Sequence, residues 1–187
     1  DAQYRFIRHT MKGTDDKYDS DAGAMRVIDQ THPFHFFNPK AGLTYRMEGG
    51  HDLYASFSIA NREPNRNNYT EAGPNETPVH ETLYDTEIGY RFQSSSLSLG
   101  ANLYWMQYRN QLILTGKISE IGELLTSNIP DSYRRGVELM AAWKPLDWFE
   151  WDGSMTLSQN KILNFTEQDV DVYDADWNWI DSRSNVL

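Results

Sequence analysis

The stretch from Glu81 to Trp105, ETLYDTEIGYRFQSSSLSLGANLYW, has the pattern of two long strands joined by a short polar turn. Every second residue from Tyr84 to Phe92 is apolar or aromatic, with one threonine among them, whereas the residues between them include two acids and an arginine. The second arm alternates in the same way from Leu97 onward. Because a strand displays alternate residues on opposite faces, this pattern predicts an antiparallel hairpin with one apolar and one polar face.

The two arms are long for a soluble sheet. Strands of soluble proteins usually have about 5–6 residues, and each arm keeps its alternation for roughly twice that length. A strand that crosses a membrane needs about 9–11 residues, and transmembrane barrels place apolar residues outward and polar residues inward. The hairpin therefore favours a membrane barrel, and a tyrosine-rich soluble β-sandwich is the alternative.

The composition of the chain narrows the classes of function. The chain has 187 residues and a net charge of -10, which opposes binding to a phosphate backbone, so no nucleic-acid partner is expected. It has no cysteine, which excludes disulfides, thiolate metal sites and cysteine nucleophiles. No run approaches the roughly 18 apolar residues of a membrane helix. Aromatic residues make up 13% of the chain, as in barrels that carry an aromatic girdle at each membrane interface.

The same alternation recurs along the chain and predicts seven strands in all. They are expected at residues 2–9, 36–47, 53–59, 81–93, 97–105 with a possible extension to 114, 132–143 and 148–165. Short turns are expected near Gly49, Ser94 and Leu146, and long polar loops at residues 10–34, 61–80, 116–131 and 166–187. Because outer-membrane barrels have short periplasmic turns and long extracellular loops, all three turns should lie at one end.

Several short motifs resemble strands of TonB-dependent outer-membrane receptors. Asn38–Tyr45 and Leu53–Ser58 look like two consecutive strands of that family. Further similar motifs follow in the family's order: Arg62-Glu63-Pro64-Asn65 for its Arg-x-Pro loop, Glu81–Leu83 leading into Glu87–Tyr90 for its Pro-Glu…Glu-x-Gly strand, and residues 104–111 and 136–139 for the next two strands. His80 stands where the family usually has proline. The resemblance covers roughly residues 35–165.

The resemblance implies an all-β fold, an antiparallel up-and-down meander of about seven long strands that is a segment of a 22-stranded transmembrane β-barrel. Seven strands cannot close such a barrel. Residues 1–187 are therefore expected to be a partial outer-membrane β-barrel domain, without a plug domain, cut from a longer chain. The location implied is the outer membrane of a Gram-negative bacterium.

The resemblance also implies import of a scarce substrate, with no enzymatic activity and no cofactor. A ferric siderophore or another metal chelate is the first expectation, with haem, glycans and cobalamin behind it. The partners implied are outer-membrane lipid, the receptor's own plug domain, an inner-membrane energy-coupling protein and the small-molecule substrate. The alternative is a secreted β-sandwich carbohydrate-binding module whose Trp and Tyr side chains stack on sugar rings; such a module would stay soluble without detergent, unlike a sheet with one apolar face.

Two groups of residues are candidates for binding. Loop residues that could hold the substrate are Arg62, Arg66, Tyr69 and His80. Charged residues expected to face the lumen or the plug are Lys40, Arg46, Asp85, Glu87, Arg91, Glu138, Glu150 and Asp152. A role without specific binding stays open for each group: the loops only cover the barrel mouth, and the charges only line a water-filled lumen.

Other residue patterns give weaker evidence for a catalytic or metal site. Glu138 and Glu150 could be imagined as a glycosidase acid pair, but no supporting site accompanies them. The aspartates at positions 15, 16, 19 and 21, and at 169, 171, 174 and 176, have the oxygen-rich spacing that Ca²⁺ accepts, yet solvated acidic loops are commoner. His32 and His35 form HxxH, and His80 lies where haem receptors of the resembled family carry a ligand histidine; exposed loop histidines are the commoner case, so no metal site is expected. Residues expected to face lipid are Leu97, Leu99, Leu103, Val137, Leu139, Phe149, Trp151 and Met155.

Overall fold

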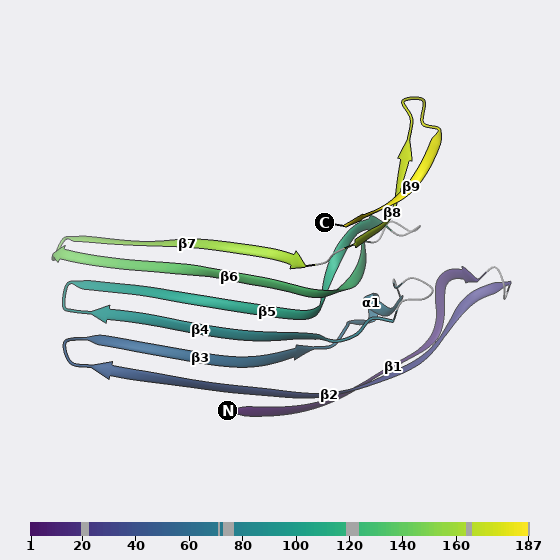
Figure 1. Cartoon of the computed structure of the whole chain (residues 1–187). Helices are drawn as coiled ribbons and strands as arrows, with labels where there is room; N and C mark the ends of the chain where they lie inside the picture. Colours follow the sequence, from purple (N-terminus) through teal and green to yellow (C-terminus); the bar gives the residue numbers. More distant parts are fainter. Residues whose placement is uncertain (20–22, 71, 73–76, 119–123, 164–165, 187) are drawn as a thin grey trace.

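One curved antiparallel sheet of seven strands makes up most of the molecule (Figure 1). The computed structural model describes residues 1–19, 23–70, 72, 77–118, 124–163 and 166–186. The strands of the sheet, in both sequence and spatial order, are β1 (Ala2–Asp19), β2 (Ala24–Met47), β3 (His51–Arg62), β4 (Glu81–Gln93), β5 (Leu97–Ile118), β6 (Leu124–Leu146) and β7 (Phe149–Leu163). A second sheet pairs β8 (Thr166–Tyr173) with β9 (Trp179–Val186), and α1 (Arg66–Thr70) lies between β3 and β4. The predicted meander of about seven long strands is confirmed, and the sheet is not closed into a barrel.

The three short turns lie together at one end of the sheet, as predicted (Figure 1). Neighbouring turns are joined by backbone hydrogen bonds, from Gln93 N to the Gly50 carbonyl and from Lys144 N to the Ser96 carbonyl, both 2.8 Å. Gly50 has a φ of 85°, and a Cβ atom there would lie 2.0 Å from the Gln93 carbonyl oxygen. A glycine is therefore required at this position by both conformation and space.

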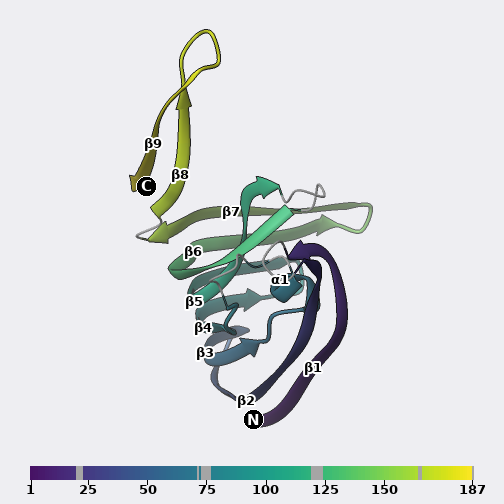
Figure 2. The same ribbon diagram turned by 90° about the vertical axis from the view of Figure 1, so that its right-hand side faces the viewer.

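The strand register separates apolar and polar residues onto the two faces. One row that crosses six adjacent strands is apolar throughout: Leu43, Ala55, Ile88, Leu103, Val137 and Leu157. The next row, on the opposite face, is mostly polar: Thr44, Tyr54, Gly89, Asn102, Glu138 and Thr156. The polar face is the inner face, because α1 lies within the curve of the sheet on that side (Figure 2). All eight residues predicted to face lipid are on the outer face.

Aromatic side chains lie near both ends of the outer face. The loop end has Tyr84, Trp105 and Tyr133, and the turn end has Tyr90, Phe92, Trp143, Phe149 and Trp151. Tyr133 and Trp143 are ten residues apart on β6, which corresponds to about 25 Å for a strand with a rise of about 3.3 Å per residue and a tilt of about 40°. This height matches the apolar band of outer-membrane barrels, about 25 Å. Among the described residues, no helix has the length and hydropathy that crossing a membrane requires.

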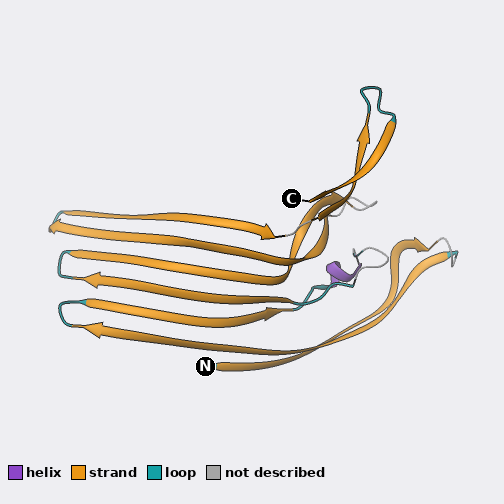
Figure 3. Cartoon of the chain, viewed as in Figure 1, coloured by secondary structure: helices purple, strands orange, loops and turns teal. Residues whose placement is uncertain are grey.

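Three of the four predicted loops are wrong, because the chain continues there as paired strands (Figure 3). Residues 10–34 fall almost entirely within β1 and β2, which stay paired as far as Asp19 and Ala24. Residues 116–131 belong largely to β5 and β6, which extend to Ile118 and start at Leu124. The expectation that no strand follows residue 165 is also wrong, since β8 and β9 form a hairpin. The prediction of a long connection at residues 61–80 is confirmed.

These strands were missed because their sequences lack the alternation that marks a sheet with one buried face. When both faces of a hairpin meet water, neither face needs apolar residues. The backbone groups are still satisfied by the partner strand whatever the side chains are. Polar segments that contain glycines and aspartates were therefore interpreted as loops.

Candidate functional site

A cluster of aromatic side chains lies on the inner face of β1 and β2 at the loop end. Phe36 is only 2% exposed, and its ring lies 5.6 Å from the ring of Phe34 and 5.4 Å from that of His80. The Arg5 guanidinium lies 5.2 Å from the centre of the Phe36 ring. This inner aromatic cluster, made of Phe34, Phe36, His80 and Arg5, is an apolar support within an otherwise polar face.

The described residues between β3 and β4, 63–70, 72 and 77–80, fold inward, toward this cluster. The ring of Tyr69, in α1, stacks on that of His32 of β2 with 4.2 Å between the ring centres. Arg26 Nη2, also on β2, donates a hydrogen bond of 2.8 Å to the Thr70 carbonyl oxygen. Figure 2 shows α1 inside the curve formed by the strands. The segment therefore lies over the inner side of the sheet.

The same segment is also attached to β6, on the other side of the curve. Asn68 Nδ2 donates to Thr126 Oγ1 at 2.8 Å, and Val79 exchanges two hydrogen bonds with the Asn128 side chain, at 2.9 and 3.0 Å. Within the segment, Asn65 and Asn68 each accept a backbone hydrogen bond from the other, which caps the start of α1. The described residues of this connection thus contact both β2 and β6 across the inner face.

The predicted substrate residues have different surroundings. Arg62 donates to Glu81 Oε2 at 3.1 Å, and the same buried oxygen accepts from Leu112 N at 3.1 Å. Arg62 therefore helps to join β3, β4 and β5. His80 is half-buried in the inner aromatic cluster. Arg66, at the first position of α1, is exposed.

Tyr69 has a packing role rather than an exposed one. Its side chain is 6% exposed, and its hydroxyl has no hydrogen-bond partner within the described part of the chain. Burial, and secondarily the negative charge of Glu63, raise the pKa of the Tyr69 phenol above its ordinary value. The phenol therefore stays neutral, and its ring packs as an apolar surface against the His32 ring.

Changing Tyr69 to phenylalanine tests this packing role. Because a buried hydroxyl without a partner costs about 1–3 kcal/mol, Tyr69→Phe is expected to stabilise the loop by about 1 kcal/mol. Hydrogen exchange of the α1 amides should slow accordingly. Tyr54→Phe is the matched comparison, because the Tyr54 hydroxyl donates to buried Asn102 at 3.1 Å. That variant should speed exchange in β3 to β5, and faster exchange around α1 in Tyr69→Phe would contradict the assignment.

The predicted lumen charges lie on the inner face but do not form one compact centre. Arg46, Asp52 and Arg91 are successive partners in one row across β2, β3 and β4 near the turn end. Glu87 lies opposite Ser56, nearer the middle of the sheet. Glu138, Glu150 and Asp152 lie on β6 and β7, and the last two are exposed. The charges therefore line the inner wall from one side of the sheet to the other.

Asp85 differs from the other charges in having one buried carboxylate oxygen. It is the cross-strand partner of Ser58 and Met106. Its Oδ1 atom is buried and has no hydrogen-bond partner among the described residues. A buried carboxylate oxygen without a donor is unfavourable in the isolated sheet, so this position is suited to a donor from outside the sheet.

The structure does not bring the candidate metal ligands together. His32 and His35 are three positions apart on a strand and therefore point to opposite faces. His32 contacts Gln30 at 3.1 Å, and His35 contacts the Tyr4 hydroxyl at 2.6 Å. Among the described residues there is no group of three or more His, Asp or Glu side chains that could hold a metal ion.

The two aspartate-rich runs are only partly described. Asp21, and the side chains of Asp15, Asp16, Asp19, Asp169 and Asp171, lie outside the described residues. Asp174 caps the β8–β9 turn: its Oδ1 accepts from the backbone N atoms of Asp176 and Asn178, and its Oδ2 accepts from Asn178 Nδ2. These hydrogen bonds, chiefly those from Asn178, hold the pKa of the Asp174 carboxyl below its usual value. This carboxylate thus has a structural role in the turn.

Sequence reasoning missed the residues that fix the start of the inward-folded segment. Arg5 Nη2 is 2.6 Å from Glu63 Oε2 and also donates to the Asn61 carbonyl oxygen at 3.1 Å. One signal was present in the sequence. Phe34 and Phe36 occupy the positions that alternate with the apolar face of β2, and aromatic residues on a polar face indicate that another segment packs there.

Comparisons with known proteins give the family. A family model described as "TonB dependent receptor-like, beta-barrel" matches residues 2–185, and no curated protein sequence matches the chain. Three solved structures with similar folds are the copper transporter OprC (18% identity, TM-score 0.68), the FrpB iron transporter from Neisseria meningitidis (16%, 0.60) and the ferric-catecholate import receptor Fiu from E. coli K12 (19%, 0.57).

The chain is much shorter than these structures. The matches cover 86%, 86% and 79% of this chain but only 26%, 23% and 21% of OprC, FrpB and Fiu, respectively. At these identities the structural likeness shows the fold alone. The match to the family model extends over nearly the whole chain, so the chain belongs to the TonB-dependent receptor family, and its meander is the fold of that family's β-barrel.

Proposed function

We propose that these strands form part of the wall of an outer-membrane receptor that imports a scarce substrate into a Gram-negative bacterium. The observation that carries the proposal is the opposite polarity of the two faces of the sheet. The outer rows are apolar over a height of about 25 Å, as contact with lipid requires. The inner rows carry the charged and amide side chains that a water-filled path needs.

The rest of the receptor would come from a longer chain. Members of this family are receptors and transporters that work with a plug domain and with energy coupling by TonB and its inner-membrane partners. We assign the inner charges, Asp85 among them, to contacts with the plug. The buried Oδ1 of Asp85 supports this assignment, because a donor from the plug would satisfy it.

A ferric siderophore or another metal chelate is the substrate class we propose. OprC is named a copper transporter, FrpB an iron transporter and Fiu a ferric-catecholate import receptor. On this chain, exposed Arg66 would present a guanidinium to an anionic chelate, which such a group binds through charge-assisted hydrogen bonds. The half-buried His80 belongs to the inner aromatic cluster, at the other end of the same connection.

An uptake experiment tests the proposal directly. The receptor gene is deleted and cells are grown under iron limitation with single ferric siderophores, and uptake of radiolabelled iron is measured. We expect the deletion strain to lose uptake of one chelate. Complementation with the full-length gene should restore this uptake, and removal of TonB should abolish it again. Unchanged uptake of iron and of other metal chelates in the deletion strain, with loss of glycan or cobalamin uptake instead, would overturn the substrate class but leave the receptor assignment.

The observations do not favour a secreted carbohydrate-binding sandwich. In a sandwich a second sheet packs on the apolar face at about 10 Å. Within the described part of this chain, the only other sheet is the β8–β9 hairpin, and the outer apolar residues Leu43, Leu103 and Leu157 remain exposed. The family is one of receptors and transporters, and an enzymatic role for Glu138 and Glu150 gains no support from their positions.

A further inference from the structure

Two basic residues stand on adjacent strands of the outer face at the loop end, although the chain has a net charge of -10. They are Arg135 of β6 and Lys161 of β7. Lys161 is the cross-strand partner of Tyr133, two positions from Arg135 on the same face. Their side chains are therefore diagonal neighbours on adjacent strands, about 7–8 Å apart at the backbone.

Arg135 is fixed at the level of the outer aromatic residues. Its Nε and Nη2 atoms donate to Gln159 Oε1 at 3.0 and 2.6 Å. Its guanidinium carbon lies 5.1 Å from the ring centre of Tyr133 and 5.8 Å from that of Trp105. Its Nη1 atom makes no hydrogen bond with any residue that the structure describes. The guanidinium is thus held in one orientation, and its Nη1 donor is available at the depth where a lipid headgroup would lie.

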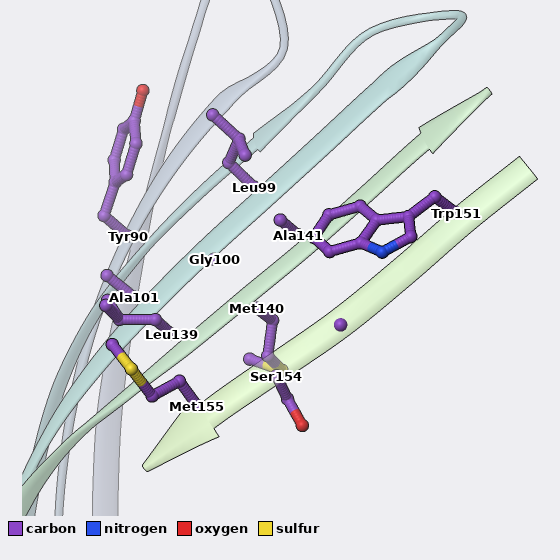
Figure 4. Close-up of a pocket in the computed structure, with 11 residues that line it drawn as sticks. Tyr90, Leu99, Gly100, Ala101, Leu139, Met140, Ala141, Trp151, Ser154 and Met155 are labelled. Carbon is purple, nitrogen blue, oxygen red and sulfur yellow. The ribbon is translucent and has the colours of Figure 1, made fainter. Parts of the chain in front are cut away.

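An apolar hollow of about 570 Å³ starts at Arg135 and extends toward the turn end. The side chains of the outer face that line it are Thr86, Ile88, Leu103, Trp105, Val137 and Leu157. A second hollow, of about 500 Å³, continues along the next rows, where Tyr90, Leu99 and Trp151 border the small residue Ala141 (Figure 4). The two hollows are lined by successive rows of the outer face, and the first is bordered by side chains large enough to flank an acyl chain.

The charge on this part of the outer face is net positive. Among the described residues of β4 to β7, Asp131 is the one acid at an outward position of the register, and it is the cross-strand partner of Arg109. Arg109 is therefore left out of the proposed site. Arg135 has no acid beside it on the outer face, whereas Lys161 has Asp131 as a diagonal neighbour, because Asp131 stands opposite Leu163, two positions from Lys161 on β7. Because Arg109 also stands beside Asp131, the group of three cations and one acid keeps a net positive charge that is available to an anion.

We propose that Arg135 and Lys161 bind a phosphate group of an anionic glycolipid in the outer leaflet, with an acyl chain of the same lipid in the hollow below Arg135. A guanidinium presents paired donors to phosphate oxygens, and Lys161 adds a second cation. The proposal rests on the outer face being the lipid face in the receptor. It is independent of which substrate the receptor imports.

Native mass spectrometry of the full-length receptor, released from detergent, tests the site. The probes are diphosphorylated lipid A, the same lipid without its phosphates, and inorganic phosphate. Arg135→Gln is expected to weaken binding of the diphosphorylated lipid at least tenfold, and adding Lys161→Gln should weaken it further. Arg135→Lys should give an intermediate loss, because it keeps the charge but not the paired donors.

Arg134→Gln is the matched control, since Arg134 is the adjacent residue on the inner face, above the Tyr108 ring. It should leave lipid binding unchanged, and the heat-modifiable gel shift verifies that each variant is folded. Equal lipid binding by Arg135→Gln and the parent receptor would overturn the proposal, as would equal losses in Arg134→Gln. Binding of inorganic phosphate as tight as that of the lipid would show an anion site to which the acyl chain does not contribute. Substrate uptake should persist in Arg135→Gln, so a failure of the lipid site and a failure of the import function are distinguishable.

Discussion

Replacing Leu139 with arginine in the full-length receptor is expected to lower the free energy of unfolding by about 2–4 kcal/mol. Leu139 is on the outer face of β6, between Ala101 of β5 and Met155 of β7. It lies six residues from Tyr133 and four from Trp143, close to the middle of the apolar band. An arginine there would have to place its charge in hydrocarbon, or reach toward either interface at the cost of local distortion.

The adjacent residue provides the control for this experiment. Met140 points to the inner face, where a Cβ atom added at Gly100 would be 3.2 Å from the methionine methyl group. Met140→Arg therefore places the same charge in the wet lumen and should change stability by less than about 1 kcal/mol. Urea unfolding of both variants in liposomes gives the comparison. Equal midpoints for Leu139→Arg and the parent protein would mean that the outer face does not contact lipid.

The transmembrane part of this fold could be predicted from the sequence because the membrane imposes the pattern. Each spanning strand must be apolar on one face and can be polar on the other, so period-two alternation marks both the strand and its orientation. Leu99, Leu139 and Met155 were placed correctly for this reason. The turns near Gly49 and Ser94 were found because glycine and serine interrupt that alternation.

The parts of the fold that could not be predicted lie beyond the membrane. Backbone pairing stabilises the loop-end halves of β1 and β2 and the β8–β9 hairpin. Their side chains do not alternate between apolar and polar, so no sequence pattern indicates the strands. Trp177 and Trp179 illustrate the difficulty, because they are 83% and 60% exposed in the structure. Trp179 starts β9, and Trp177 precedes it in the connection from β8, with a φ of 62°.

The candidate site was predicted in composition but not in geometry. Charged residues of the inner face, such as Arg46 and Glu138, follow from strand parity. The inward fold of the described residues between β3 and β4 depends on contacts between residues far apart in sequence, such as Asn68 with Thr126 and Tyr69 with His32. No local pattern encodes such pairs, so Tyr69 was predicted only as a substrate-binding loop residue, and its burial was not predicted.

Replacing residues 66–76 with a short Gly/Ser linker is expected to weaken substrate binding to the full-length receptor at least tenfold, about 1.4 kcal/mol. The replacement removes α1, with exposed Arg66 and the Tyr69 ring, from the inner face. The Arg62–Glu81 ion pair and the contacts of Val79 with Asn128 stay in place on either side of it. The barrel should therefore keep its heat-modifiable gel shift, and the loss of affinity can be assigned to the segment.

This replacement also distinguishes capture from mere covering, because the described residues of the segment contact both β2 and β6 across the inner face. If residues 63–80 capture substrate, affinity falls, and Arg66→Ala alone should reproduce part of the loss because its guanidinium is the exposed cation of α1. If the segment only covers the barrel mouth, affinity and uptake persist while large antibiotics that the outer membrane normally excludes enter more readily. Persistence of both affinity and uptake in the linker variant would remove the capture role from this segment. The inner charges of β2 to β7 would then be the remaining candidates.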